Sequence, residues 1–126
     1  MTSAARKIPA EILLVEDDKF LRQLYYDGLS LAGYNVDVAV NGSDALGKLS
    51  GKGYDLVITD MRMPVLGGME FYLRSIDKYP ELKDRFIFMS GDSSWDYNVT
   101  PCLVARRINK PFKIKDLLVR VNALEG

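Results

Sequence analysis

The chain has 126 residues, of which 48% are hydrophobic and 27% are charged, a composition typical of one globular domain with a buried core. Basic and acidic residues number 17 each, so no excess of positive charge favours direct nucleic-acid binding. The absence of histidine excludes histidine-based catalysis and histidine-ligated metals, and the lone Cys102 excludes an internal disulfide. No membrane-spanning run or secretory signal is evident, so we expect a cytoplasmic protein without membrane insertion.

The first ten residues are mostly small or polar and contain a proline, which indicates a flexible leader (1–10) before a domain over 11–126. Short aliphatic runs then alternate with amphipathic stretches. The runs lack strict polar alternation, as expected for parallel strands that are covered on both faces. The predicted strands are Ile12–Val15, Val36–Val40, Leu56–Thr59, Phe86–Met89 and a weaker fifth within Leu103–Ile108.

Apolar residues recur at helical spacing between these strands. The first helix is expected to end at Gly33 and the second near Gly51. The segment 91–109 is poor in helix signals, so the fourth helix is expected to be short or irregular. This alternation predicts an α/β fold with a doubly wound, five-stranded parallel sheet and helices on both faces. The residues that mark the inner helix faces are Leu21, Leu24, Tyr25 and Gly28, then Leu46 and Leu49, then Met69, Tyr72, Leu73 and Ile76, and finally Ile114, Leu117, Leu118 and Val121.

Ligands of open α/β sheets bind at the carboxyl ends of the strands, so the residues there indicate the chemistry. Carboxylates without histidine or cysteine form a hard oxygen site that suits Mg²⁺, with Mn²⁺ as a substitute. A lysine and a hydroxyl beside such a site form a cradle for a phosphoryl group, and Asp60 can act as a nucleophile that forms an aspartyl phosphate. The strands end in Glu16-Asp17-Asp18, Asp60, Ser90-Gly91 and Lys110-Pro111.

Two further features of the sequence have simpler interpretations. Asp18 stands directly before a helical pattern, so we interpret it as the N-cap of that helix and not as a metal ligand. Gly42 to Lys48 has the glycine and lysine spacing of a phosphate-binding loop. The loop would need serine or threonine next, where the chain has Leu49 on an apolar helix face, and we therefore reject this alternative.

The segments ILLVEDD, DLVITDMRMP, MSG and KPF occur in this order at strand ends, and together they resemble the receiver domain of two-component response regulators. The resemblance covers residues 11 to 124. It implies a flavodoxin-like (βα)5 fold and a signalling function in which an aspartate accepts a phosphoryl group.

By this resemblance Asp60 is the phosphoacceptor. The metal ligands would be the carboxylates of Glu16, Asp17 and Asp60 and the backbone carbonyl of Arg62. The resemblance also assigns the residues that contact the phosphoryl group and shape the loops. These are Ser90 as the switch hydroxyl, the backbone of Gly91, Lys110 as the pairing cation, Pro111 after a cis peptide bond, and Pro64 and Gly68 in the turn before the third helix.

Two features depart from the family pattern. Arg107 stands three positions before Lys110, where family members usually carry an aromatic residue that turns inward on phosphorylation. An arginine is costly to bury without a charge partner. The short path from Ser90 to the lysine resembles receivers attached to hybrid histidine kinases, which hand the phosphoryl group to a histidine phosphotransfer protein. A stand-alone regulator is the alternative, and the sequence does not decide between them.

The sequence thus predicts a receiver and not an enzyme. Its expected partner is a histidine kinase or histidine phosphotransfer protein, which exchanges a phosphoryl group with Asp60 in the presence of Mg²⁺. One alternative is a pseudo-receiver that binds partners without phosphorylation, which Arg107 favours. Another is a Mg²⁺-dependent phosphatase with an aspartyl nucleophile, which would need an acid where Arg62 stands. Homodimer formation is compatible with the sequence but not indicated by it.

Overall fold

The computed structural model describes residues 11–63, 65–91 and 106–124. The predicted leader, Pro64, Cys102 and residues 92–105, where the fourth helix was expected, lie outside this part of the chain. In chain order the elements are β1 (Glu11–Val15), α1 (Lys19–Leu31), β2 (Asn35–Ala39), α2 (Gly42–Gly51), β3 (Leu56–Asp60), α3 (Gly68–Lys78), η2 (Pro80–Leu82), β4 (Phe86–Ser90), β5 (Arg107–Asn109) and α5 (Ile114–Asn122).

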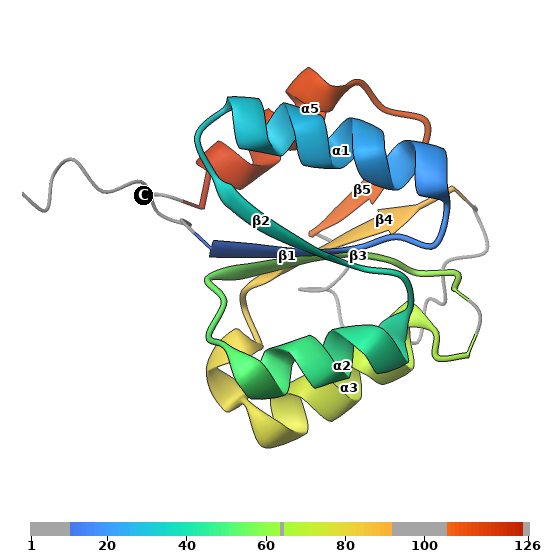
Figure 1. The fold of residues 1–126 in the computed structure, drawn as a ribbon, viewed down its shortest axis with the longest axis vertical. Coiled ribbons are helices and arrows are strands. Elements are labelled where there is room, and N and C mark those ends of the chain that lie inside the picture. The colour runs from blue at the N-terminus through green and yellow to red at the C-terminus, as the bar shows by residue number, and fades with distance from the viewer. Residues whose placement is uncertain (1–10, 64, 92–105, 125–126) are drawn as a thin grey trace, which may run out of the picture.

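The strands form one parallel sheet in the order β2-β1-β3-β4-β5. Helices α1 and α5 cover one face of this sheet, and α2 and α3 cover the other (Figure 1). From β1 the chain first adds β2 on one side, and it then crosses to the other side to add β3, β4 and β5. The switch point, at which such sheets bind ligands, therefore lies between the carboxyl ends of β1 and β3. The predicted doubly wound fold is confirmed.

Each face of the sheet carries its own hydrophobic core because the central strands are buried on both sides. The core under α2 and α3 is aromatic: Tyr72 packs edge-on against Phe86 and Phe88, whose rings are stacked at 5.6 Å. The core under α1 and α5 is mainly aliphatic and includes Leu29 and Leu117. These two layers hold β1, β3 and β4 rigidly, so the residues at their carboxyl ends have a fixed frame.

Local sequence features fix the ends of several elements. Asp18 caps α1 by accepting a hydrogen bond from the backbone N–H of Leu21 at 2.9 Å, as predicted. Gly33 follows the C-cap of α1 with φ of 100°, a conformation that glycine adopts without strain. Gly28 in α1 permits close approach of α5, because a Cβ there would lie 2.2 Å from the side chain of Ile114.

Some details differ from the sequence predictions. Leu24 and Leu73, which we expected on inner helix faces, are exposed, because the buried faces centre on Tyr25 and Phe71 and are narrower than the apolar patterns. The fifth strand was expected within Leu103–Ile108 and occupies Arg107–Asn109. No helix among the described residues combines the length and the apolar character needed to cross a membrane.

Candidate phosphoacceptor and metal site

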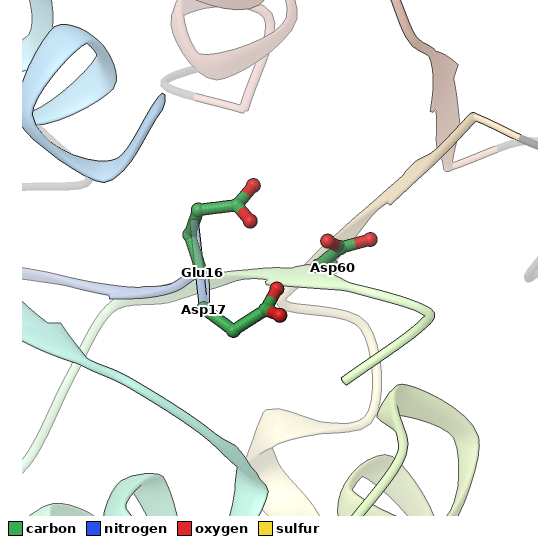
Figure 2. Close-up of side chains that lie close together, drawn as sticks. All are labelled: Glu16, Asp17 and Asp60. Atoms are coloured by element: carbon green, nitrogen blue, oxygen red, sulfur yellow. The ribbon is translucent and has the colours of Figure 1, made fainter. Parts of the chain in front are cut away.

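The carboxyl ends of the two central strands bring three acids together. β1 and β3 pair in register with Val15 beside Thr59, so the residues that follow them are neighbours. Glu16 is fully buried, Asp17 is exposed, and Asp60 is 7% exposed. One carboxylate oxygen from each of the three lies within 4.8 Å of the others. Figure 2 shows the carboxylates of Glu16 and Asp17 directed toward the side on which Asp60 lies.

These carboxylates have the chemistry of a hard cation site. All donors are oxygens, and the chain has no histidine that would favour a softer metal. Mg²⁺ usually binds one or two protein carboxylates and completes its coordination with water and phosphate oxygens. One exposed and two buried carboxylates at the edge of a sheet therefore fit a Mg²⁺ or Mn²⁺ ion that stays accessible to a phosphoryl group.

Lys110 joins two of the acids from the end of β5. Its Nζ lies 2.7 Å from Glu16 Oε1 and 3.1 Å from Asp60 Oδ2. The backbone N–H of Lys110 donates to the carbonyl of Ser90 at 2.8 Å, and this bond attaches the start of the following loop to the end of β4. The peptide bond to Pro111 is cis, as the family resemblance implied. We call Glu16, Asp60 and Lys110 the acceptor cluster.

Burial and charge act against each other in the acceptor cluster. Burial raises the pKa of Glu16 to about 7, although the hydrogen bonds that it accepts from Lys110 and from the backbone of Asp18 oppose this rise. Burial alone would lower the pKa of Lys110, but the hydrogen bond to Glu16 and the charge of Asp60 outweigh it, so that the pKa is raised. Lys110 thus remains a cation, and the buried acids favour any added positive charge.

Backbone hydrogen bonds hold the acids in place. Glu16 Oε2 accepts from the N–H of Asp18 at 3.1 Å, and Asp60 Oδ1 accepts from the N–H of Arg62 at 3.3 Å. Arg22 on α1 donates to the carbonyl of Glu16 at 2.9 Å and to that of Asp17 at 3.4 Å. The sequence analysis did not identify Arg22, because a single arginine in a helix carries no signal of this contact.

The loop after Asp60 is crowded and strained. A Cβ at Gly68, the first residue of α3, would lie 2.5 Å from the carbonyl oxygen of Asp60, so only glycine lets the helix begin this close to Asp60. Val65 has φ of 73°, which is unfavourable for a β-branched residue. Strain of this kind is often found beside functional sites.

The remaining predicted residues lie on neighbouring strands. Ser90 is buried at the end of β4, and a Cβ on Gly91 would lie 3.6 Å from Lys110 Cβ. Arg107 begins β5 in register with Phe88, two residues before Ser90, and its carbonyl accepts a hydrogen bond from Arg120. The backbone of Arg107 therefore lies further down the sheet than that of Lys110, and nothing in this geometry assigns it a switch role.

Comparisons with known proteins agree with this geometry. The profile of the response regulator receiver domain matches residues 12–122. The chain belongs to the response regulator receiver family. CpdR of Brucella abortus, a response regulator receiver protein, is 33% identical to this receiver over 114 residues, which cover 90% of this chain and 92% of CpdR. The response regulator ArlR of Staphylococcus aureus is 32% identical over 119 residues, and these cover 90% of this receiver and 52% of ArlR.

Solved structures of response regulators also match this chain. The response regulator TrrA of Thermotoga maritima, in complex with Mg(2+)-BeF, matches this receiver with a TM-score of 0.80 and 31% identity, covering 91% of this chain and 98% of that chain. The chemotaxis response regulator CheY4 of Vibrio cholerae matches with a TM-score of 0.77 and 27% identity, covering 91% and 98%. The predicted family and the predicted receiver fold are both confirmed.

Proposed function

We propose that this receiver accepts a phosphoryl group on Asp60 from a phosphohistidine on a partner protein, in a reaction that requires Mg²⁺. The proposed receiver unit is 11–126. The observation that carries the proposal is the acceptor cluster with Asp17 beside it: a nucleophile, a lysine and an acidic cation site converge at one sheet edge. The similar structure of TrrA was determined with Mg(2+)-BeF, which supports metal binding in this family.

In the proposed reaction, a carboxylate oxygen of Asp60 attacks phosphorus in line, a new O–P bond forms, and the P–N bond to the imidazole breaks. The imidazole nitrogen leaves with the bonding electron pair. Glu16, Asp17, Asp60 and the carbonyl of Arg62 would hold a divalent cation, which would supply positive charge to stabilise the phosphoryl oxygens. Lys110 holds Asp60 Oδ2 at 3.1 Å and is placed to pair with a phosphoryl oxygen once the group is attached.

After transfer, we propose that Ser90 and the backbone of Gly91 bind the phosphoryl group. Ser90 is anchored at the end of β4 and is tied to Lys110 through the bond between its carbonyl and the lysine N–H. Binding of the phosphoryl group by Ser90 and Lys110 would therefore move the loops after β4 and β5 together. This coupling is the proposed route by which phosphorylation alters the surface of the receiver.

The proposed partner is a histidine kinase or a histidine phosphotransfer protein. Helix α1 begins beside the acceptor cluster and presents an apolar stripe to solvent. Phe20 in its first turn is 76% exposed, and Leu31 at its end is 89% exposed. Leu24 lies between them on the same face, where the exposed Asp27 interrupts the stripe. Exposed apolar side chains aligned along one helix favour packing against another helical surface. A partner docked on this stripe would bring its phosphohistidine close to Asp60.

The test is the reaction of the purified protein with a small acyl phosphate and Mg²⁺, followed by intact-protein mass spectrometry. We expect a phosphoryl adduct that is stable in acid and labile in base, and that does not form when EDTA removes the metal. Asp60→Asn should form no adduct. Asp55→Asn is the matched control and should react normally, because Asp55 stands just before the opposite end of β3 from Asp60, where its side chain accepts a hydrogen bond from the backbone of Glu11.

Two results would contradict the proposal. Absence of an adduct on the parent protein would favour a pseudo-receiver, and an adduct that survives in Asp60→Asn would move the acceptor to another residue. Steady turnover of a phosphomonoester without an accumulated adduct would instead indicate a phosphatase.

A further inference from the structure

The edge strand β2 exposes hydrogen-bonding groups of its backbone. β2 is the last strand on its side of the sheet, with α1 on one side of it and α2 on the other (Figure 1). The carbonyl of Ala39 accepts from the N–H of Glu16 at 3.1 Å, so the backbone of Ala39 faces β1. Because residues of a parallel strand alternate between the two sides, the N–H and C=O groups of Val36 and Val38 face outward. Within the described residues, no hydrogen bond occupies them.

A groove of about 680 Å³ runs along this edge, which is within the usual size of binding sites. Val36 and Val38 lie in its floor. Side chains of α1 form one wall, and residues at the end of α2 and in the loop between α2 and β3 form the other. The wall residues used below are Arg22 and Tyr26 on α1, Lys48 on α2, and Lys52 and Tyr54 after it.

The charge of the groove favours an acidic ligand. Three cations line it, and Asp37 is the one acid among its lining residues. Lys52 pairs with Asp37 and with Glu11 just outside the groove. Arg22 donates only to backbone carbonyls among the contacts of the described chain, so no carboxylate neutralises it. Lys48, likewise, forms no ion pair within the described residues. A ligand that carries carboxylates would therefore meet two cations that form no ion pair within the described residues.

We propose that the edge of β2 binds an extended, acidic segment of a partner protein, which adds to the sheet as a further strand. The outward groups of Val36 and Val38 would supply the backbone hydrogen bonds. Alternate side chains of the added strand would point to opposite faces, one set toward Arg22 on α1 and the other toward Lys48 on α2. Acidic residues on both faces of the segment are therefore the expected recognition feature. This site does not depend on the phosphorylation of Asp60.

A second copy of this chain fits the edge less well. Two β2 strands paired across a two-fold axis would place the same cations against each other, and like charges opposite one another destabilise strand pairs. The same positive charge protects the free protein, because lysine side chains beside an edge strand discourage edge-to-edge aggregation. An acidic strand is complementary to the positive charge of the groove, whereas a copy of β2 with its own cations is not.

The experiment uses a synthetic peptide, Glu-Glu-Val-Thr-Val-Glu-Glu, blocked at both ends and titrated into the ¹⁵N-labelled protein. In a strand, two of its glutamates point to each face. We expect the amide resonances of Val36 and Val38 to shift and their hydrogen exchange to slow. Lys48→Glu should weaken binding about tenfold, because it replaces an attraction with a repulsion. Lys115→Glu, an equal charge change at an exposed position of α5, should change affinity less than about twofold.

A second peptide separates strand addition from simple charge attraction. Glu-Glu-Pro-Pro-Pro-Glu-Glu has the same charge, but its adjacent prolines remove backbone donors from both sides of the strand, so it should not slow exchange at Val36 or Val38. Equal binding of both peptides, shifts confined to another surface, or no binding at all would overturn the proposal. Concentration-dependent dimerisation that protects the same two amides without peptide would also overturn it, in favour of a second copy.

Discussion

Two clusters in this receiver have the same composition, two carboxylates and one lysine, and differ in burial. In the acceptor cluster, the side chain of Lys110 is 17% exposed and that of Glu16 is fully buried. In the second cluster, which we call the edge cluster (Glu11, Asp37 and Lys52), the lysine side chain is 45% exposed, and the side chains of Glu11 and Asp37 are 29% and 42% exposed.

This difference in burial reverses the direction of the carboxylate pKa shifts. In the edge cluster a hydrogen bond from Lys52 lowers the pKa of Glu11, and a hydrogen bond from Tyr54 lowers that of Asp37. In the acceptor cluster burial raises the pKa of Glu16. In the edge cluster, hydrogen bonds and solvent stabilise the charged carboxylates. In the acceptor cluster, burial disfavours the charged form of Glu16, so an added cation would stabilise it. Composition alone does not distinguish a functional site from a surface ion pair.

Removal of the two lysines should give the largest contrast. Lys110→Met leaves buried Glu16 without its cation, and we expect a loss of about 3 kcal/mol in the free energy of unfolding. Lys52→Met should have a much smaller effect, because water solvates the carboxylates that it leaves behind. The measurement is urea unfolding in EDTA at a pH above 7, where Glu16 is charged. Equal losses in the two variants would contradict the comparison.

The pH dependence of stability should have opposite signs in the two clusters. Because the folded pKa of Glu16 is raised from 4.5 to about 7, the native state binds more protons in this interval, and stability from Glu16 falls as pH rises through it. The folded pKa of Asp37 lies below 3.8, so its stabilisation is present above that pH and is lost as pH falls through the folded value.

Urea unfolding over a pH series in EDTA measures both effects. Glu16→Gln should remove a decline of at most about 1.4 kcal/mol per pH unit between the two pKa values of Glu16. Asp37→Asn should instead reduce the loss of stability at acidic pH. A decline that persists unchanged in Glu16→Gln would show that another group causes it.

Two glycines test how tightly the acceptor end is packed. Gly68→Ala places a Cβ against the Asp60 carbonyl and should destabilise the protein by about 2 kcal/mol and slow phosphorylation. Gly47→Ala on α2 meets no atom within 4 Å and should stabilise the protein by up to about 1 kcal/mol, since alanine is the better helix former. Thermal unfolding of both variants measures the contrast. A neutral Gly68→Ala would show that the loop after Asp60 can relax.

The smallest expected effect comes from the strained residue in the same loop. Val65→Asn should stabilise the protein by about 1 kcal/mol, because asparagine tolerates a positive φ that valine does not. Val119→Asn replaces another exposed valine, in α5 at a regular helical position, and should change stability by only a few tenths of a kcal/mol. If the two changes have the same effect, the backbone at Val65 is not strained in solution.

The strand-end residues could be predicted because each lies at the end of an aliphatic run, and parallel strands place such ends together. Asp18 could be predicted as a cap because it stands directly before a helical pattern. The ion pair between Lys110 and Glu16 could not, since the two residues are 94 positions apart and neither pattern encodes the depth of burial. The edge cluster and its groove were also missed, because they depend on which strand lies at the edge.

The most direct test of the central claim is to locate the phosphoryl group after transfer from a phosphohistidine protein. Borohydride reduces an aspartyl phosphate to homoserine, which peptide sequencing by mass spectrometry identifies. We expect homoserine at position 60 in the presence of Mg²⁺ and unmodified aspartate there in EDTA. Homoserine at another acid, such as Asp17 or Asp55, or none at any position after exposure to a competent donor, would contradict the assignment of Asp60 as the acceptor.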